Sequence, residues 1–379
     1  MLRVLDVRVL RGRGGGPEKT LAYSAPYLAR LGYEMICVYL CDPKDEDARS
    51  TVDEIARRGT RVYMLDDTGP LDITVPYNLY RLVDQLGISI YHGHDYKSNV
   101  LGCLLGNPCI RVTTLHGWVH YTHRLRYYYA VEKWCLRKFA RAYCVSQELY
   151  RAASRLGLGS KQLYYLPNGI IFEEYRRVNN THKARAKLGI PHQGFCLGAV
   201  GRLSEEKNFS ALLMSVRVLR RAGFPVWGML VGDGPLRQKL ERQSYEQGIR
   251  DHIVFAGYQR DIRPWLECMD VYLCTSTREG MPNSVLEAMA MEVPIIATRV
   301  GEVPYMITHG REGVLLPSAG VEEIVKVVTD MIRGKLDKEM LAKQARTRVE
   351  TEFNFDRRMR LLAADYDKLV AQYGRRARV

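Results

Sequence analysis

Apolar strand-like runs alternate with helical stretches along most of this chain, and the alternation begins twice. In the first half, the runs expected to be strands are 2–10, 34–39, 61–65, 88–91, 110–114 and 142–145. In the second half, they are 195–200, 226–231, 253–255, 271–274 and 294–297. Strands that alternate with helices form parallel sheets covered on both faces, so the pattern predicts an α/β protein with two doubly wound, Rossmann-like units.

The length agrees with two domains, because 379 residues exceed the size at which a single core keeps growing. A turn signal at Leu166-Pro167-Asn168-Gly169 ends the first unit, and a polar helical linker over 181–189 precedes the second. We therefore expect an N-terminal domain over residues 1–175 and a C-terminal domain over 176–351. A long, basic amphipathic helix is expected near Phe355 to Gln372.

The charge is strongly basic and unevenly placed. The net charge is +14, and residues 101–165 hold ten Lys/Arg against two acidic residues, while residues 331–379 hold thirteen against seven. Such segments attract an anionic partner, which leaves a nucleotide, a nucleic acid or an acidic membrane surface open.

The cysteines and the hydropathy of the chain narrow the class of protein further. The nine cysteines are odd in number and form no Cys-x-x-Cys pair, which favours reduced thiols in a cytoplasmic protein over a disulfide framework or a zinc site. No apolar run reaches the roughly 18 residues needed to span a bilayer, and no signal-peptide pattern follows Met1.

Glycine, histidine and charged residues stand just after several of the predicted strands. In the first half they are Gly14 to Gly16, His94 and His116; in the second half they are Arg202, Lys207, Gly257, Glu279 and Glu287. Open α/β sheets bind ligands at the carboxyl edge of their strands, where the strand order reverses. We therefore expect two such edges that face each other across one interdomain cleft.

The segment from Arg278 to Ala290 is the most specific of these. Pro282 suits the first position of a helix, and backbone N–H groups near Met281 to Ser284, at the positive end of that helix, favour a phosphate. Glu279 and Glu287 flank this anion site, and a carboxylate accepts two hydrogen bonds from the vicinal hydroxyls of a sugar or ribose. The alternative is that Glu279 is a loop charge and Glu287 a solvated helix residue.

Three other side chains are candidates for chemistry. Arg202 and Lys207 lie five residues apart in a loop that enters a helix, so both cations can reach one diphosphate; otherwise they belong to a solvated loop. His116 follows a strand and can hydrogen-bond a sugar or transfer a proton, although it can equally be a structural histidine.

A metal site is not expected. His92 and His94 bracket Gly93, but no third ligand is evident in the sequence.

Taken in order, these motifs resemble the retaining GT-B glycosyltransferases of the group 1 and family 4 type, which carry a Glu-x7-Glu signature. The matching residues are the Gly-rich first loop, His116-Gly117, Pro167-Asn168-Gly169, Gly201-Arg202, Glu206-Lys207-Asn208, Gly232-Asp233-Gly234-Pro235, Gly257 and Glu279 to Glu287. The resemblance implies the GT-B fold, with the C-terminal helix (residues 352–379) crossing back to the N-terminal domain. It covers nearly the whole chain.

The resemblance also implies residue roles. Arg202 and Lys207 would hold the diphosphate, Glu279 would contact the transferred sugar, and His116 would face that sugar; these four form the expected catalytic set. The expected donor-binding residues are Gly15, Gly16, Gly257, Tyr258, Gln259, Gly280, Met281, Pro282, Asn283, Ser284 and Glu287. Similar enzymes need no metal, since arginine and lysine stabilise the leaving diphosphate, and they hold no resident cofactor. Their co-substrate is a UDP- or GDP-linked sugar.

The function expected from the resemblance is hexosyl transfer, with retention of anomeric configuration, from a nucleoside-diphosphate sugar to a hydroxyl acceptor. The acceptor would be a glycan or lipid-linked glycan in cell-surface polysaccharide synthesis. Two alternatives are a sugar-nucleotide epimerase on a related fold and a basic, non-catalytic nucleic-acid-binding protein, although no nucleic-acid-binding motif is present.

A basic helix near residues 122–141 suggests a further hypothesis. Arg126, Lys133, Arg137 and Arg141 are spaced to share one face, which favours peripheral contact with an anionic membrane on its cytoplasmic side. The alternative is an ordinary sheet-covering helix with a solvated basic side.

Overall fold

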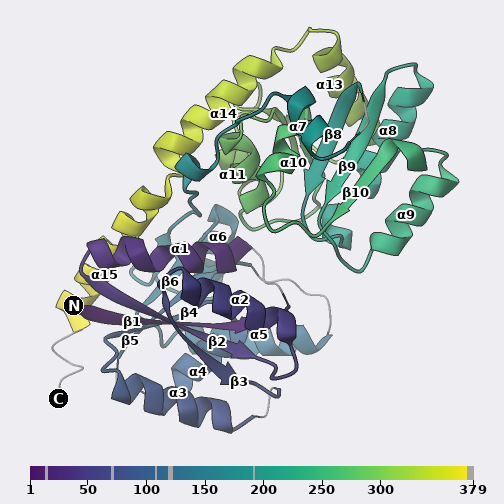
Figure 1. Cartoon of the computed structure of the whole chain (residues 1–379). Coiled ribbons are helices and arrows are strands. Elements are labelled where there is room, and N and C mark those ends of the chain that lie inside the picture. The colour runs from purple at the N-terminus through teal and green to yellow at the C-terminus, as the bar shows by residue number, and fades with distance from the viewer. Residues whose placement is uncertain (13–15, 70–71, 107–108, 118–122, 191–192, 374–379) are drawn as a thin grey trace. The chain divides into compact units, whose positions relative to one another are not determined.

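The computed structural model describes residues 1–12, 16–69, 72–106, 109–117, 123–190 and 193–373. It divides the chain into two compact units (Figure 1). Unit 1 comprises residues 1–168 together with 356–379, and unit 2 comprises residues 169–355. Each unit holds one parallel β-sheet, as the alternation of strands and helices predicts.

The sheet of unit 1 has seven strands in the order β3-β2-β1-β4-β5-β6-β7. The order reverses between β1 and β4, which makes that position the switch point of the sheet. The strands are β1 (Leu2–Leu10), β2 (Tyr33–Cys41), β3 (Arg61–Asp66), β4 (Ile90–Gly93), β5 (Ile110–Leu115), β6 (Arg141–Cys144) and β7 (Leu163–Tyr165). The helices are α1 (Gly16–Arg30), α2 (Glu46–Arg57), α3 (Thr74–Gln85), α4 (Tyr96–Leu104), α5 (His123–Leu136), α6 (Gln147–Arg155) and α15 (Phe355–Tyr373).

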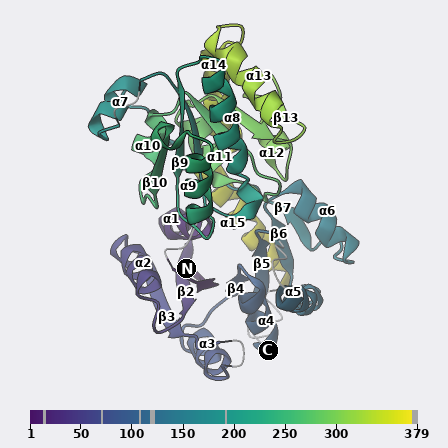
Figure 2. The same cartoon turned by 90° about the vertical axis from the view of Figure 1, so that its right-hand side faces the viewer.

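The two faces of this sheet have different partners. Leu5 and Val7 of β1 pack with apolar residues of α3 and α4, whereas Asp6 between them points to the opposite face. Strand β4 alternates in the same way: Tyr91 donates a hydrogen bond to the Ser98 carbonyl in α4, and His92 meets Tyr366 of α15. Figure 2 shows α2 and α3 near β3, with α4 beside α5.

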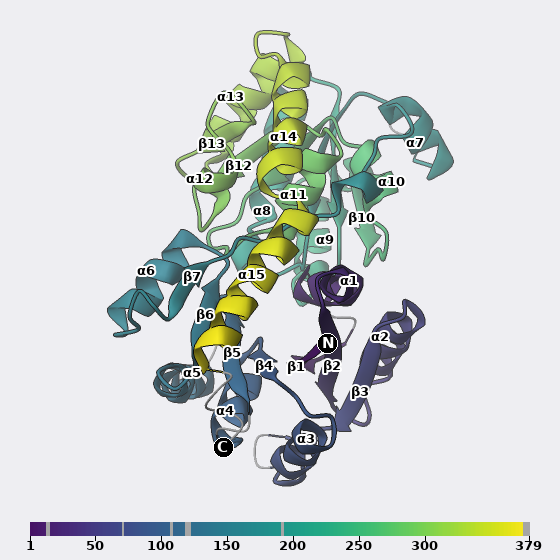
Figure 3. The ribbon, with the colours of Figure 1, turned by 90° about the vertical axis from the view of Figure 1, so that its left-hand side faces the viewer.

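Helix α15 packs against unit 1, so the expected return of the last helix to the N-terminal domain is confirmed; Figure 3 shows it beside β5 and β6. Asp365 of α15 is buried and accepts two hydrogen bonds from Arg141, at 2.7 and 2.8 Å, and one from the Tyr143 hydroxyl at 2.9 Å. Arg358 donates to the Pro167 carbonyl at 3.1 Å. Polar contacts thus fix a helix whose Asp365 is more than 220 residues away in sequence from its partners in β6.

The sheet of unit 2 has six strands in the order β10-β9-β8-β11-β12-β13, with its switch point between β8 and β11. The strands are β8 (Phe195–Val200), β9 (Val226–Val231), β10 (Ile253–Gly257), β11 (Val271–Cys274), β12 (Ile295–Thr298) and β13 (Val314–Leu316). The helices are η1 (Phe172–Glu174), α7 (Thr181–Lys187), η2 (Glu205–Lys207), α8 (Ser210–Arg221), α9 (Arg237–Glu246), η3 (Arg250–His252), α10 (Arg263–Glu267), α11 (Asn283–Ala290), α12 (Val303–Met306), α13 (Val321–Ile332) and α14 (Lys338–Glu352). Helices α8, α9 and α13 share one apolar core, and α11 lies beside α14.

Three local expectations are wrong. Strand β4 runs over Ile90–Gly93, so His92 lies within it and not after it. Helix α5 ends at Leu136, and Arg141 begins β6. Arg137 and Arg141 therefore do not continue a basic helix face with Lys133, because the chain turns at Arg137–Phe139.

The sequence patterns also missed several elements. Helix α4 was missed because it carries Gly102, a poor helix former; the structure shows why glycine is used there, since a Cβ atom would lie 2.5 Å from the ring of Tyr91. The strands β7 and β13 have only three residues each, too few to show a period.

We expect Asp365→Ala to destabilise unit 1 by about 3 kcal/mol or more, because it leaves the mostly buried Arg141 charge and the Tyr143 hydroxyl without their acceptor. Urea unfolding followed by circular dichroism measures the loss. The matched control is Asp356→Ala on the same helix, whose pair with Arg360 is exposed and is worth less than about 1 kcal/mol. Equal unfolding midpoints for the two variants would contradict the role given to Asp365.

Candidate functional site

The loops at the carboxyl edge of the unit 2 sheet are joined to one another by hydrogen bonds. Gly232 N, after β9, donates to Gly257 O at 2.8 Å, and Gly201 N, after β8, donates to Val231 O at 3.0 Å. Across the switch point, Thr277 N donates to Glu206 O at 2.8 Å and the Thr275 hydroxyl to Lys207 O at 2.8 Å. The loops that carry most of the expected site residues thus form one continuous rim.

Glycines in this rim allow the backbones to approach closely. A Cβ atom on Gly232 would lie 2.0 Å from the Gly201 carbonyl oxygen, and one on Gly301 would lie 2.2 Å from the Glu279 carbonyl oxygen. Gly301 also has φ +53°, a left-handed conformation that favours glycine. The next residue, Glu302, donates its backbone N–H to Gly280 O at 2.8 Å. This bond also holds the loop that contains Glu279.

Lys207 and Glu279 meet directly in this structure. The Lys207 ammonium donates to Glu279 Oε1 at 2.5 Å, and the Ser276 hydroxyl donates to the same oxygen at 2.6 Å. Burial disfavours the ammonium ion, but the Glu279 carboxylate outweighs that effect and raises the pKa of Lys207. The site therefore holds a stable cation and a carboxylate in contact, whose remaining N–H and oxygen positions can bind a polar ligand.

Arg202 lies on the loop between β8 and η2 with its side chain exposed. Among the described residues, no carboxylate pairs with its guanidinium, whereas Lys207 pairs with Glu279. An exposed, planar cation on the same loop as Lys207 suits a diphosphate, which accepts paired hydrogen bonds from a guanidinium.

Helix α11 follows the loop containing Glu279. Pro282 precedes this helix as its N-cap, with extended backbone angles, so the expectation that it occupies the first helical position is wrong. The first helical hydrogen bonds are donated by Val285 and Leu286 to the Pro282 carbonyl, and the Tyr272 hydroxyl of β11 donates to the Ser284 hydroxyl at 2.8 Å. Gly280 to Ser284 thus form the turn from strand to helix, where a helix dipole presents its positive end.

Glu287 is buried on α11, which excludes the alternative of a solvated helix residue. Its Oε1 accepts a hydrogen bond from the Tyr175 hydroxyl at 2.9 Å. Tyr175 was not among the expected site residues, because it lies more than 100 residues away in sequence and no strand precedes it.

The segment Gly257-Tyr258-Gln259 lies farther along the same rim, and Gly257 is the last residue of β10, not a loop residue after it as expected. Gly257 has φ +69°, and its carbonyl accepts the bond from Gly232. Tyr258 is exposed, and the Gln259 amide donates to Ala256 O at 2.7 Å. This turn is separated from the switch point by β9 and β8, so its residues do not contact Glu279 through any hydrogen bond between described residues.

The remaining expected site residues belong to unit 1. Gly16 begins α1, and Gly15 lies outside the described residues. His116 follows β5 and is partly buried, and its Nε2 lies 3.4 Å from Nδ1 of His94.

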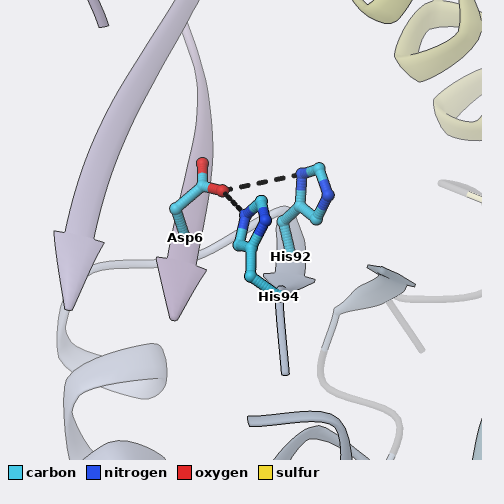
Figure 4. A group of neighbouring side chains, drawn as sticks. All are labelled: Asp6, His92 and His94. Carbon is cyan, nitrogen blue, oxygen red and sulfur yellow. Dashed lines mark hydrogen bonds and ion pairs between the residues drawn. The ribbon is translucent and has the colours of Figure 1, made fainter. Parts of the chain in front are cut away.

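A cluster of buried polar residues lies at the switch point of unit 1 (Figure 4). Asp6 of β1 and His92 of β4 are direct neighbours in the parallel register, and His94 Nε2 is hydrogen-bonded to Asp6 Oδ1. The rings of His92 and His94 stack with their centroids 4.3 Å apart. Asp6 was not predicted, although an acidic residue inside an apolar strand was a signal that could have identified it.

Burial sets the protonation of this cluster. It raises the pKa of Asp6 to about 6, partly opposed by His92 and by Arg358, and it lowers the pKa of His92 to about 3. Burial also lowers the pKa of His94 and of His116, and the Arg8 and Arg358 charges act in the same direction. At neutral pH the cluster therefore consists of a carboxylate and neutral imidazoles.

Asp6, His92 and His94 are also the residues that suit a metal by type, since one ligand atom of each lies within 4.8 Å of the others. Both nitrogens of His92 are already hydrogen-bonded, Nδ1 with the Tyr366 hydroxyl at 2.6 Å and Nε2 with the Thr114 hydroxyl at 2.8 Å. A divalent ion would also meet the repulsion of Arg358. This donor set fits a hydrogen-bonded cluster better than a metal centre.

Two further expectations are addressed by the described residues. All nine cysteines are free, and eight of them are buried. No helix among the described residues has the length and apolar character of a membrane span.

Comparison with known protein families matches both units. Residues 14–174 match Glycosyltransferase Family 4, and residues 194–333 match Glycosyl transferases group 1. Among curated relatives, UDP-Gal:alpha-D-GlcNAc-diphosphoundecaprenol alpha-1,3-galactosyltransferase of Escherichia coli is 25% identical over 301 residues, which cover 74% of this chain and 76% of that protein. The lipopolysaccharide core biosynthesis glycosyltransferase LpsE of Rhizobium meliloti is 28% identical over 170 residues, 45% of this chain and 49% of that protein.

Solved structures agree on the fold. The crystal structure of HepE from Anabaena, determined in complex with UDP-glucose, has a TM-score of 0.85 at 19% identity and covers 97% of this chain and 100% of its own. The chain therefore has the two-domain α/β glycosyltransferase fold known as GT-B. It belongs to the glycosyltransferases, with a Family 4 domain followed by a group 1 domain.

We expect Gly301→Ala to lower the thermal unfolding midpoint clearly more than Gly310→Ala. Both glycines have positive φ, so alanine strains the backbone at either position, but only the new methyl group at position 301 meets the carbonyl oxygens of Glu279 and Gly280. The excess cost should be about 1–3 kcal/mol, as for other overpacked sites. Similar midpoints for the two variants would show that the loop containing Glu279 adjusts freely.

Proposed function

We propose that this chain is a retaining, metal-independent glycosyltransferase that moves a hexose from a nucleoside-diphosphate sugar to a hydroxyl acceptor in cell-surface polysaccharide synthesis. The observation that carries the proposal is the contact between Lys207 and Glu279 at the switch point of unit 2, with Arg202 on the same loop. The Arg202 and Lys207 cations and the Glu279 carboxylate, on loops at one switch point, suit a ligand that has both a diphosphate and sugar hydroxyls.

The relatives support the donor and acceptor classes. The Escherichia coli relative is named for a UDP-linked donor and a diphosphoundecaprenol-linked acceptor, and the similar HepE structure contains UDP-glucose. We therefore propose a UDP-linked sugar as the first donor to test, with a GDP-linked sugar as the second. We also propose a glycan or lipid-linked glycan as the acceptor, and a cytoplasmic location.

The proposed chemistry uses fixed charges. As the bond between the anomeric carbon and the diphosphate breaks, negative charge grows on the leaving oxygen, and the Arg202 and Lys207 donors stabilise it where they already stand. Lys207 has three N–H donors, so it can keep its bond to Glu279 while it donates to a phosphate oxygen. The acceptor hydroxyl would attack from the same face as the departing diphosphate and pass its proton to that group, which retains the configuration.

The polar neighbours would orient the ligand. Glu279, held by Ser276 and Lys207, is placed to accept hydrogen bonds from hydroxyls of the transferred sugar. Glu287, oriented by Tyr175, is proposed for the ribose hydroxyls, and the turn Gly257-Tyr258-Gln259 for the base. The turn from Gly280 to Ser284 would donate backbone N–H groups to the diphosphate, and His116 would bind a sugar hydroxyl.

Arg202→Ala should weaken nucleoside-diphosphate binding by about 10- to 100-fold, because charge-assisted hydrogen bonds are worth about 1.5–3 kcal/mol. In a thermal-shift panel of nucleoside diphosphates and nucleotide sugars, a ligand at 100 times its dissociation constant adds about 2.7 kcal/mol to the unmodified protein. The variant should lose most of that shift. The control is Arg221→Ala, an exposed arginine at the end of α8.

The stabilising nucleotide sugar is then assayed for transfer, and the anomeric configuration of the product is read by proton NMR. No stabilisation by any nucleotide, or an equal shift in both arginine variants, would contradict the proposed donor site. An inverted product would contradict the proposed mechanism alone.

We also propose that unit 1 contacts an anionic membrane carrying the acceptor, through Trp134, Leu104 and Lys138 in place of a continuous basic helix face. Trp134 of α5 is 55% exposed and Leu104 at the end of the neighbouring helix α4 is 67% exposed. The Lys138 ammonium lies 4.2 Å from the centre of the Trp134 ring. Exposed Trp beside Lys is typical of residues at a membrane interface.

Trp134→Ala should therefore reduce co-sedimentation with anionic phospholipid vesicles by several-fold, because it removes the amphipathic ring that enters the interface. Tyr245→Ala is the control, since Tyr245 of α9 is 78% exposed and belongs to unit 2. Equal recovery of the unmodified protein with neutral and anionic vesicles would contradict membrane binding.

A further inference from the structure

The three residues Asp6, His94 and His116 form a hydrogen-bonded row at the switch point of unit 1. Asp6 Oδ1 bonds to His94 Nε2, and His94 Nδ1 lies 3.4 Å from His116 Nε2. The rings of His94 and His116 lie at 29° to each other, with centroids 5.7 Å apart. The row thus leads from a fully enclosed carboxylate to a partly exposed histidine.

The backbone holds the middle of the row in place. His94 N donates to the Ser98 hydroxyl at 2.9 Å, and Asp95 caps α4 through Lys97 N and Ser98 N at 3.0 and 2.9 Å. Asp95 also accepts a bond from Val9 N at 2.8 Å, which ties the end of β1 to the start of α4. Asp6 and His94 are therefore supported by the same two elements.

The chemistry of an imidazole gives this row a direction. An ionised carboxylate can only accept, so His94 must carry its proton on Nε2, which leaves its Nδ1 as an acceptor. His94 Nδ1 then accepts from His116, which must carry its proton on Nε2. The Nδ1 atom of His116 is left as an acceptor, and among the described residues it has no hydrogen-bond partner. Ionisation of Asp6 above pH of about 6 agrees with this direction.

We propose that Asp6 and His94 are positioning residues that hold His116 in its Nε2–H tautomer, so that His116 Nδ1 accepts a hydrogen bond from a hydroxyl group of the bound sugar. The second part rests on the proposed function, whereas the tautomer is a property of the protein alone. Recognition by an acceptor nitrogen selects a ligand O–H group and disfavours a phosphate or carbonyl oxygen, which has no proton to donate.

His92 provides the comparison within the same cluster. It stacks on His94, but its two nitrogens bond to Tyr366 and Thr114, and neither of them leads to His116. A substitution at Thr114 therefore disturbs the same buried cluster without breaking the row. This gives a matched control for any loss of stability.

The test is the tautomer of His116 measured by nitrogen NMR. The protein is labelled with ¹⁵N-histidine, and the His116 signals are assigned by their absence in His116→Gln. At pH 8, without ligand, the unmodified protein should show a pyrrole-like Nε2 and a pyridine-like Nδ1 at His116. In Asp6→Ala the two nitrogens should move toward averaged shifts, whereas Thr114→Val should leave them unchanged.

Kinetics test the second part. With the stabilising nucleotide sugar, Asp6→Ala should lower kcat/KM by about 10-fold, the loss expected from one hydrogen bond, and Thr114→Val should not. In a double variant, Asp6→Ala should cause no loss of kcat/KM beyond that of His116→Ala, because Asp6 acts through His116.

The possible outcomes distinguish a failure of this proposal from a failure of the proposed function. An Nδ1–H tautomer at His116 in the unmodified protein would overturn the proposal, and so would an unchanged tautomer in Asp6→Ala. A stoichiometric metal in the purified protein, with His92 and His94 showing metal-shifted signals, would overturn it in favour of a metal centre. The predicted tautomer in a protein that transfers no sugar would support the row while contradicting the proposed function.

Discussion

The named strands of both sheets pair in parallel, and this constraint brings the loops that carry Arg202, Lys207 and Glu279 to one edge of the unit 2 sheet. Strands that run in one direction send each following loop to the same edge of the sheet, and at the switch point two neighbouring loops turn to opposite faces. In unit 2 those loops are Gly201–Lys207 and Thr275–Pro282, and hydrogen bonds from Thr275 and Thr277 join them. In unit 1 the strands β1 and β4 pair at the switch point, which brings Asp6 beside His92.

Much of the fold could be predicted from the sequence, because buried strands and amphipathic helices leave a local period. Strand β1 and strands β8, β9 and β11 begin and end where their apolar runs do. The failures occur where local patterns carry little information. β13 has three residues, α4 contains a glycine required by Tyr91, and the continuous basic spacing through Arg141 crosses a turn and enters a strand.

The positions of some candidate site residues could also be predicted from the sequence. Lys207 and Glu279 could be placed at the same edge of the sheet from their positions after two strands, but their direct contact was not predicted. Ser276 and Tyr175 could not, because their roles depend on the path of loops and on packing between segments far apart in sequence. The cluster at Asp6 depends on α15, whose Tyr366 reaches His92 from the other end of the chain, and no local pattern can reveal such a contact.

The two switch points handle charge in different ways. In unit 2, Lys207 and Glu279 form an ion pair, while the exposed Arg202 on the same loop as Lys207 has no carboxylate partner among the described residues. In unit 1, the Asp6 carboxylate is buried within the electrostatic reach of Arg358, and burial lowers the pKa of Arg358 only to about 10, so the guanidinium keeps its charge. A buried carboxylate is stable only if such charge and hydrogen bonds compensate its lost hydration. The His94 imidazole, which lies between Asp6 and the partly exposed His116, supplies such a hydrogen bond and so helps an acidic residue to remain inside an otherwise apolar strand.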